Sequence, residues 1–515
     1  MTGLRLLAAA CVIHLVLILP AAPMPVGQAL LRIAPELPLI LLALPLLGRV
    51  GRAAVFLALS VLAVQKIADL AMTAALGRPF NVLADMALIG AGADLLAQTL
   101  GMARLLAGSA ALAVAVLAAG AALWWATGTW SRLAWRPAGR LALVSVAALS
   151  IVLAGMGLGW TGNAPYTLTR VELLRQTAQD LRQIRTLAAR DDLAGATGLL
   201  AEIDRDVLVI FVESYGRASF DAPYHAKRHL ETLRRAQGRL AEAGLAMRSG
   251  FLTAPTQGGQ SWLSHATFAN GLWIADQTRY GAVLASGRQG LFHHARRAGF
   301  RTAAVMPAIT RPWPEGDTMG FDRILAAGDL GYRGQPFNWV TMPDQFTLAA
   351  TDRLLRGTGG PHLFAQVALI SSHAPWVPVP RLLDWDRMGD GTVFDAMAQT
   401  GDPPEVVWQD RNRVRAAYRD AVDYSLATVM DYALRHADDP PLLIVLGDHQ
   451  AVPWVAQDDG PDTAIHLIGP AHLVDRAADW GFAPGLIPPS EQQALPMDRM
   501  RDLILRGFGG KMPQS

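Results

Sequence analysis

The chain opens with long apolar stretches and continues with a region in which short apolar runs alternate with amphipathic stretches. A membrane-spanning helix needs about 20 largely apolar residues. The pattern predicts five such helices, at about 6–24, 29–47, 53–75, 104–127 and 141–160. Residues 162–204 keep a helical spacing of Leu and Ile but carry many charges, which predicts one or two amphipathic juxtamembrane helices. We therefore expect a transmembrane domain at 1–160, a helical linker at 161–204 and a globular domain at 205–515.

The globular region has the pattern of a mostly parallel sheet covered by helices on both faces. Continuous apolar, β-rich runs are typical of strands buried on both faces, and they alternate here with amphipathic stretches. Such alternation predicts an α/β domain rather than separate all-α and all-β parts. The strand-like runs are 206–214, 247–252, 301–306, 362–371, 441–447 and 463–469, and the helix-like stretches are 225–243, 286–299, 343–356 and 410–436.

Charge separates the two regions and orients the first. Residues 1–160 hold only 10 of the 45 Lys and Arg and 4 of the 43 Asp and Glu residues. If the N-terminus is cytoplasmic, the arginines before the first span, between the second and third spans and between the fourth and fifth spans all fall on the cytoplasmic side, and the globular domain then lies outside the cytoplasm. The first span is alternatively a cleaved signal peptide, with Ala21 and Ala22 near the end of its apolar core, which leaves this orientation unchanged. The flanking arginines are Arg5, Arg49, Arg52, Arg132, Arg136 and Arg140.

Two classes of protein are excluded by composition. The only cysteine, Cys11, lies in an apolar run, so the chain is not a disulfide-stabilised scaffold. The basic excess belongs to the apolar region, and no basic stripe with interleaved aromatic residues is present, so we expect no nucleic-acid partner.

Polar side chains follow the predicted strands where ligands bind in open α/β sheets, beyond the carboxyl ends of the strands. Glu213 ends the first strand, His373 follows the fourth, and Asp448 and His449 follow the fifth. After the second strand comes a turn-rich loop at 253–261, which ends in a serine. We expect these four segments to bring carboxylate, imidazole and hydroxyl groups to one rim of the sheet.

This set of groups suits a divalent cation such as Mn²⁺, Mg²⁺ or Zn²⁺. Such a cation lowers the pKa of a neighbouring hydroxyl and offsets charge on a phosphate. Each of these residues also has a purely structural interpretation. Glu213 would be a solvated strand end, Gly258-Gly259 would form a turn, and Ser261 would be a helix N-cap. It is the combination on one rim that predicts a metal site.

The ordered motifs VESYG, GGQS, SSHAPW and LGDH resemble the alkaline phosphatase/sulfatase superfamily, and most closely its membrane-anchored, lipoteichoic-acid-synthase-like branch of phosphoglycerol transferases. The resemblance covers roughly 205–470. It implies an alkaline-phosphatase-like fold in which Glu213, Asp448, His449 and Ser261 bind one metal ion. Mn²⁺ is the preferred candidate for this ion, with Mg²⁺ or Zn²⁺ as alternatives. Whether a second metal ion binds is left open.

The same resemblance assigns Ser261 as the nucleophile, where this branch more often has Thr. The nucleophile loop is only partly reproduced, so Thr256 and Ser264 remain alternatives. His373 matches a histidine that contacts the phosphoryl group or substrate. Trp339 and Asp344, in NWVTMPDQF, resemble a segment near the head-group pocket and are the loosest match.

The resemblance implies a transferase of the bacterial inner membrane that moves a phospholipid-derived head group, phosphoglycerol or phosphoethanolamine, to a glycan or glycolipid hydroxyl outside the cytoplasm through a covalent serine intermediate. Two other functions remain open: a membrane-tethered phosphodiesterase, phosphatase or sulfatase-like hydrolase that uses the same site, and a non-catalytic sensor or scaffold. The Cys-x-Pro-x-Arg signature of formylglycine sulfatases is absent from the sequence, which argues against an ordinary sulfatase.

Overall fold

A computed structural model describes residues 2–30, 32, 34–76, 78–86, 102–134, 137–156, 162–338 and 340–510. By its internal contacts the chain divides into two compact units, Met1–Asp180 and Leu181–Ser515. The division falls inside the predicted linker 161–204. Residues 181–204 belong to the second unit, where Leu193, Leu199 and Leu200 are buried in its core.

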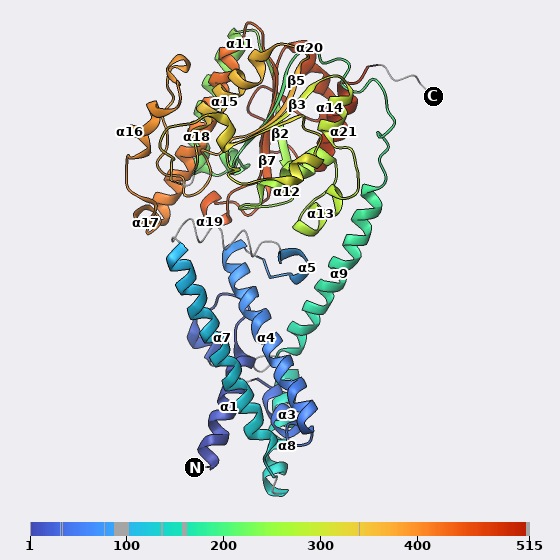
Figure 1. Ribbon diagram of the computed structural model, residues 1–515, viewed down its shortest axis with the longest axis vertical. Helices are drawn as coiled ribbons and strands as arrows, with labels where there is room; N and C mark the ends of the chain where they lie inside the picture. The colour runs from blue at the N-terminus through green and yellow to red at the C-terminus, as the bar shows by residue number, and fades with distance from the viewer. Residues whose placement is uncertain are drawn as a thin grey trace. The chain divides into compact units, whose positions relative to one another are not determined.

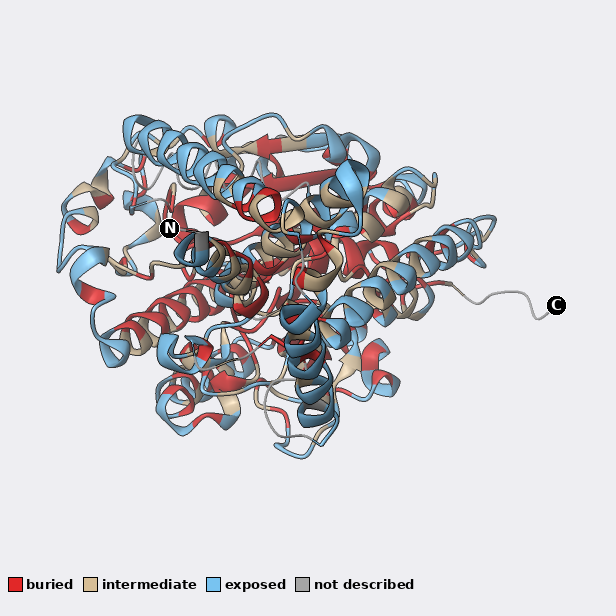
Figure 2. Cartoon of the chain, turned by 90° about the horizontal axis from the view of Figure 1, so that it is seen from below, coloured by how far each residue is buried: buried red, intermediate tan, exposed pale blue. Residues whose placement is uncertain are grey.

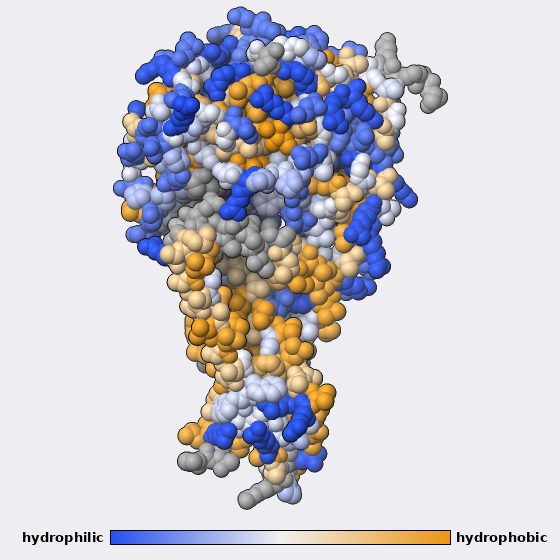
Figure 3. Space-filling model, viewed as in Figure 1, coloured by the Kyte–Doolittle hydropathy of each residue, from blue (hydrophilic) through white to orange (hydrophobic). Residues whose placement is uncertain are grey.

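The N-terminal unit is helical, and the face of it seen in Figure 3 is largely apolar, with hydrophilic side chains near its lower end. Among the described residues, two helices are long and apolar enough to cross a membrane, at Gly48–Ala74 and Met102–Ser131, and they contain the predicted spans 53–75 and 104–127 apart from one residue. The predicted spans 6–24 and 141–160 fall on shorter apolar helices. The helices are α1 (Thr2–Ile18), α2 (Val26–Leu30), α3 (Glu36–Ala43), α4 (Gly48–Leu76), α5 (Val82–Asp85), α7 (Met102–Ser131), α8 (Pro137–Gly155) and the first part of α9 (Ala164–Ala188).

The predicted span 29–47 forms no continuous helix. It is broken between α2 and α3, at a stretch that contains Arg32 and Pro35. Pro35 is the N-cap of α3, a position where its missing N–H costs no helical hydrogen bond, whereas inside a continuous helix it would remove one. Glu36 opens α3 and accepts hydrogen bonds from the backbone and side-chain amides of Asn163 at the start of α9, so its charge has a partner within the unit.

The second unit is built on one mixed, mostly parallel sheet (Figure 1). Its strand order is β4-β3-β5-β1-β6-β7-β2-β8, with β9 paired to β2. The strands from β4 to β6 are parallel, whereas β7 runs antiparallel to both of its neighbours. The strands are β1 (Val207–Val212), β2 (Ala246–Thr253), β3 (Arg301–Met306), β4 (Arg323–Ala326), β5 (Leu363–Ala368), β6 (Leu442–Gly447), β7 (Asp462–Gly469), β8 (Ala483–Pro484) and β9 (Leu495–Pro496).

Helices cover both faces of this sheet, which confirms the α/β fold that the alternating pattern predicts. Every residue of β1 is buried, and such strands are drawn in red in Figure 2. Leu208, Ile210 and Val212 pack toward α11, α15 and α18, while Val207, Val209 and Phe211 pack toward α12, α14 and α21. The longer helices are α11 (Pro223–Glu242), α12 (Ser261–Asn270), α13 (Gln277–Leu284), α14 (Leu291–Arg297), α15 (Asp344–Leu354), α18 (Arg411–Arg435) and α21 (Met500–Gly507); the short ones are α10 (Ala218–Asp221), α16 (Asp395–Ala398), α17 (Pro404–Val407), α19 (Pro453–Ala456) and α20 (Ala471–Val474).

Candidate metal centre

The register of the two central strands brings the acidic residues together. Val212 at the end of β1 pairs with Gly447 at the end of β6. Since these strands are parallel, Glu213 and Asp448 leave the sheet at the same level and on adjacent strands. Gly447 is needed for this approach, because a Cβ at that position would lie 1.9 Å from the backbone oxygen of Tyr215.

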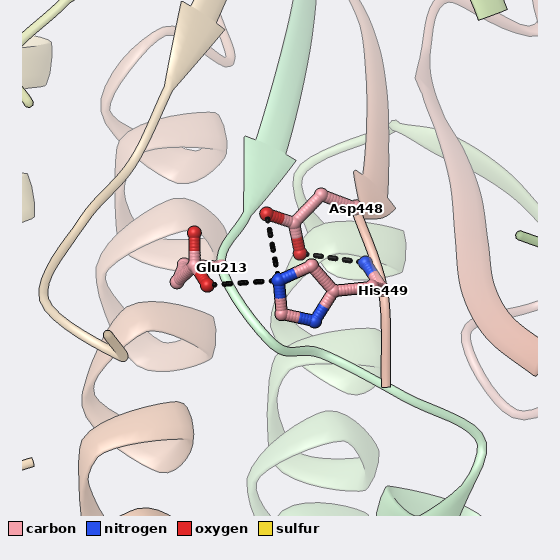
Figure 4. Close-up of side chains that lie close together, drawn as sticks. All are labelled: Glu213, Asp448 and His449. Carbon is pink, nitrogen blue, oxygen red and sulfur yellow. Dashed lines mark hydrogen bonds and ion pairs between the residues drawn. The ribbon is translucent and has the colours of Figure 1, made fainter. Parts of the chain in front are cut away.

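Glu213, Asp448 and His449 form a buried group whose ligand atoms all lie within 4.8 Å of one another (Figure 4). Their exposed fractions are 8%, 1% and 2%. His449 Nε2 lies 3.1 Å from Glu213 Oε1 and 3.9 Å from Asp448 Oδ2. Asp448 Oδ1 accepts hydrogen bonds from the backbone N–H groups of Ser214 and His449, which fixes the carboxylate in place.

The chemistry of these atoms fits a divalent cation. His449 Nδ1 lies 3.1 Å from the Gln450 carbonyl oxygen, which only accepts, so the ring proton sits on Nδ1 and the lone pair on Nε2 faces the carboxylates. Nε2 is buried and has no hydrogen bond with proper geometry among the described residues. When the ring is neutral, three electron-pair donors therefore converge with no hydrogen atom between them, as a cation requires.

The charges of the group are strongly coupled. Burial and the adjacent Glu213 carboxylate raise the pKa of Asp448 to about 7. Burial opposes the charged form of His449, but Asp448 and Glu213 outweigh it and raise its pKa to about 9. Burial also opposes ionisation of Glu213, yet the His373 and His449 imidazoles hold the pKa of this carboxyl well below its usual value. In the metal-free group a second proton on His449, at Nε2, therefore balances the two carboxylates, and a bound cation would take the place of that proton.

The loop after β2 carries a hydroxyl to this group. Gly258 N–H donates to the Gln450 carbonyl oxygen (2.7 Å), which holds the loop against the segment that follows β6. Gly258, Gly259 and Gln260 all have positive φ, and α12 begins at the next residue, Ser261. The N-cap is Gln260, so Ser261 occupies the first helical position instead of the predicted cap. Its hydroxyl donates to Glu213 Oε2 at 3.0 Å.

The two alternative nucleophiles are placed differently. Thr256 and Ser264 are buried, and their hydroxyl oxygens lie 3.3 Å from each other. Of the three hydroxyls considered, Ser261 is the one whose hydrogen bond to a member of the acidic group the structure shows.

His373 follows β5 and belongs to the same edge of the sheet. Its segment is tied to the group because Ser372 Oγ donates to the Glu213 carbonyl oxygen at 2.6 Å. His373 Nδ1 lies 2.8 Å from the Ala374 carbonyl oxygen, which places the ring proton on Nδ1. Burial lowers its pKa, so the ring is neutral near pH 7.

Asp344 lies behind this segment. Its side chain is fully buried at the start of α15, where Oδ1 accepts the backbone N–H groups of Ile370 and Ser371 and Oδ2 accepts the Ser425 hydroxyl. In this structure it positions the backbone that leads to His373, and a direct contact with substrate stays a prediction. Trp339 lies outside the described residues.

Sequence reasoning missed two buried side chains near the group. Gln450 accepts the Ala218 N–H and donates to the Gly460 carbonyl oxygen, which links three loops. His265 lies one helical turn after Ser261, with its ring centroid 4.1 Å from that of Phe211. Burial lowers the pKa of His265 to about 4, so it is neutral at pH 7. The only sequence signal for either residue was that a polar side chain lies close to a motif, LGDH for Gln450 and GGQS for His265.

A protein-family model described as Sulfatase matches residues 205–458. The chain is also similar to solved structures. Phosphoethanolamine transferase EptA from Neisseria meningitidis has 14% identity and a TM-score of 0.40, with 90% of this chain and 84% of that one covered. The lipoteichoic acid synthase LtaP from Listeria monocytogenes has 14% identity and a TM-score of 0.36, with 56% of this chain and 72% of that one covered. The phosphoglycerol transferase GacH from Streptococcus pyogenes has 11% identity and a TM-score of 0.37, with 65% of this chain and 92% of that one covered. Among curated proteins, none matches the chain.

Proposed function

We propose that this protein, whose residues 205–458 belong to the sulfatase family of the alkaline phosphatase superfamily, is a metal-dependent transferase of a phospholipid-derived phosphoryl head group. The acceptor is a glycan or glycolipid hydroxyl outside the cytoplasm, and Mn²⁺ is the first candidate cation. One observation carries the proposal: the Ser261 hydroxyl lies 3.0 Å from Glu213, a member of a buried group that can hold a metal, in a chain with two helices that can cross a membrane.

The residues of the site support a two-step reaction. A cation held by Glu213, Asp448 and His449 would lower the pKa of the Ser261 hydroxyl and offset the charge of the phosphoryl group. Ser261 Oγ attacks phosphorus, the bond from phosphorus to the diacylglycerol oxygen breaks, and that oxygen leaves with the proton released from Ser261. The product is a phosphodiester between Ser261 and the head group. An acceptor hydroxyl then attacks phosphorus, and Ser261 recovers a proton as it leaves.

His373 is suited to relay these protons. It is half-buried and neutral, and the ring nitrogen that carries the lone pair is Nε2, since Nδ1 donates to Ala374. Ser372 and Asp344 hold its backbone segment beside Glu213. A proton acceptor with a depressed pKa takes up the acceptor's proton in the second step and releases it readily to Ser261.

The sequence also argues for phosphoryl rather than sulfuryl substrates. Sulfatases that use a cysteine-derived formylglycine as nucleophile need a cysteine at the nucleophile position. The sole cysteine of this chain, Cys11, lies in α1 of the N-terminal unit. An unmodified serine is the nucleophile expected for phosphoryl transfer through a covalent intermediate.

The test is intact-mass analysis of the purified full chain after exposure to phospholipids. We expect a mass increase equal to the head-group phosphate in the natural protein and in Ser264→Ala, and none in Ser261→Ala, together with a loss of transfer of at least about 10³-fold. Undiminished transfer by Ser261→Ala would refute the assigned nucleophile. Release of free head-group phosphate with no acceptor adduct would instead show a hydrolase.

A further inference from the structure

Exposed apolar side chains in the second unit gather beside the segment that follows His373. Among its described residues, few large hydrophobic side chains are exposed, and two of them lie close together: Val406 (39%) on α17 and Trp408 (45%) directly after it. Trp454 on α19 is half-buried against Trp408, with ring centroids 6.2 Å apart. We call Val406, Trp408, Trp454 and the neighbouring Arg411 and Arg415 the rim patch.

The rim patch is attached directly to the catalytic segment. Trp408 stacks on the buried Trp376, with ring centroids 5.6 Å apart and planes within 3°. Its indole N–H donates to the Pro375 carbonyl oxygen at 3.3 Å, and Trp376 donates to the Ser372 carbonyl oxygen at 2.8 Å. The stacked ring of Trp376 and its hydrogen bond to Ser372 therefore connect the exposed Trp408 to the residue before His373.

The topology places the patch at the catalytic edge of the sheet. α17 lies in the segment after β5, and α19 in the segment after β6. These strands are parallel to β1, so the segments begin at the edge where Glu213 and Asp448 emerge. Figure 1 shows α17 and α19 along the same edge as α12, which carries Ser261.

Two arginines of the patch, Arg411 and Arg415, form no ion pair with a carboxylate of the described residues. Arg411, Arg415 and Arg419 are spaced at i, i+4 and i+8 on α18, so they share one face of the helix. Arg411 lies over the Trp454 ring, 5.6 Å from its centroid, and Arg415 Nε donates to the Trp454 carbonyl oxygen at 2.8 Å.

The acidic side chains at this end of α18 have partners other than Arg411 and Arg415, while Glu405 on α17 is exposed beside Val406. The ion pairs of the described residues at this end of α18 are Arg413 with Asp402 and Arg419 with Asp420. The Asp410 side chain accepts the Asn412 N–H as the helix cap. Arg411 and Arg415 thus present positive charge beside exposed indole and aliphatic groups.

We propose that the rim patch docks the catalytic edge onto the surface of an anionic phospholipid bilayer. Indole rings favour the head-group level of a membrane, aliphatic side chains favour the adjoining acyl region, and each arginine gains attraction from anionic head groups. A sugar would also suit the two tryptophans, but the exposed Val406 and the unpaired positive charge favour lipid. The benefit to catalysis rests on the proposed function, because docking presents the site to a phospholipid donor.

The docking is tested in the full chain by spin labelling. In a Cys11→Ser background, Val406→Cys and the matched control Leu382→Cys carry a nitroxide; Leu382 is similarly exposed (37%) but lines a cavity between α11 and α18. The protein is placed in bilayers of phosphatidylcholine with equal parts of phosphatidylglycerol. We expect the label at 406 to favour oxygen over a water-soluble nickel chelate and the label at 382 to show the reverse. Equal, aqueous behaviour of both labels, or a change at 406 only on adding soluble oligosaccharide, would overturn the proposal.

A kinetic comparison separates docking from the reaction. For the double variant Val406→Ser/Arg411→Ser we expect kcat/KM on a bilayer donor to fall about tenfold, with no change on a soluble short-chain donor. An equal fall on both donors would overturn the docking role. If the natural protein turns over neither donor, the proposed function fails, while the spin-label result still decides whether the patch docks.

Discussion

Gly447 shows how a residue without chemistry of its own controls the metal centre. It ends β6 beside the loop after β1, and a Cβ there would meet the Tyr215 backbone oxygen at 1.9 Å and its carbonyl carbon at 2.8 Å. Backbone atoms cannot swing away as a flexible side chain does. The Glu213 and Asp448 segments approach this closely only because position 447 lacks a side chain.

We expect Gly447→Ala to separate these segments and to lower both stability and metal affinity. The free energy of unfolding should fall by about 2 kcal/mol or more, as for other overpacked sites. The control is Gly281→Ala in α13, where an added Cβ meets no atom within 4 Å and should stabilise the helix by about 0.5–1 kcal/mol. Thermal melting of both variants, with and without Mn²⁺, is the measurement. An unchanged melting midpoint for Gly447→Ala would contradict the steric argument.

Removal of the cation is the second test at this scale. Glu213 and Asp448 are 8% and 1% exposed and repel each other, so a bound cation should stabilise the folded chain and a chelator should lower its melting midpoint by several degrees. Mn²⁺ added after the chelator should restore it. Asp448→Asn removes one ligand charge at constant shape, and its midpoint should respond to neither reagent. A full Mn²⁺ response in that variant would exclude Asp448 as a ligand.

The core of this site was predictable because its residues sit at strand ends. Glu213, Asp448 and His449 directly follow buried apolar runs, and parallel strands bring their carboxyl ends to one edge. The position of Asp344 was not predictable. The sequence motif is identical whether the carboxylate faces substrate or, as here, accepts hydrogen bonds from backbone amides in the interior. The role of Gln450 was not predictable either, because it depends on loops that meet only in the folded chain.

At the scale of elements, α11 is held to α18 and α19 by two buried histidines. His225 Nε2 lies 3.0 Å from the Val455 carbonyl oxygen, and His229 Nε2 lies 2.8 Å from that of Arg419. Both Nδ1 atoms are buried without a hydrogen-bond partner among the described residues, so a second proton on either ring would have no acceptor. We call these two hydrogen bonds the histidine clamp, and it depends on His225 and His229 staying neutral.

This clamp predicts a loss of stability in acid. Burial lowers the pKa of His229 to about 4, although the hydrogen bond to the Arg419 carbonyl oxygen and the Asp423 carboxylate oppose this shift. The unfolded chain binds a proton near pH 6.5 and the folded one does not, so stability is complete above pH 6.5 and falls toward pH 4. Between pH 7.5 and pH 5 the loss is about 2 kcal/mol.

His229→Gln keeps a donor for the Arg419 carbonyl but cannot titrate. We expect the drop in melting midpoint between pH 7.5 and pH 5 to shrink by several degrees in this variant. Arg235→Gln, on an exposed position of α11, is the control and should leave the drop unchanged. Equal drops in the natural protein and His229→Gln would show that this ring does not control the acid response.

The elements that the pattern predicted are those with long, continuous burial. All six expected strands form, and 301–306 matches β3 residue for residue. β4 has four residues and β8 and β9 two each, too short for a periodic signal. The antiparallel direction of β7 was also hidden, because a strand covered on both faces shows the same apolar run in either direction.

At the scale of the whole molecule, the contrast in charge and hydropathy anticipates the two compact units but not the residue at which they divide. The amphipathic pattern of 161–204 is continuous, and α9 itself runs through the division at Asp180–Leu181. What separates its two ends is their packing: Ile184 and Ala188 belong to the same buried hydrophobic cluster as Leu263 and Ile274 of the second unit. Such partners are distant in sequence, so no local pattern reveals them.

The proposed orientation in the membrane gives a prediction for the entire chain. If the arginine-flanked ends of the apolar helices lie in the cytoplasm, residue 50 at the start of α4 is inside and the second unit is outside. Val50 is 85% exposed and the Asp439 side chain 96%, so a cysteine at either position is open to reagent from its own side. Both variants are made in a Cys11→Ser background and treated with a membrane-impermeant maleimide in intact spheroplasts.

We expect Asp439→Cys to react in intact spheroplasts and Val50→Cys to react only after the membrane is permeabilised. The reverse pattern would place the catalytic unit in the cytoplasm. Acceptors outside the cell membrane would then be beyond the reach of Ser261, and the proposed transfer would have to be abandoned even if the metal centre and the serine behave as expected. Reaction of both positions in intact spheroplasts would equally exclude this orientation, because residue 50 would then lie outside the cytoplasm.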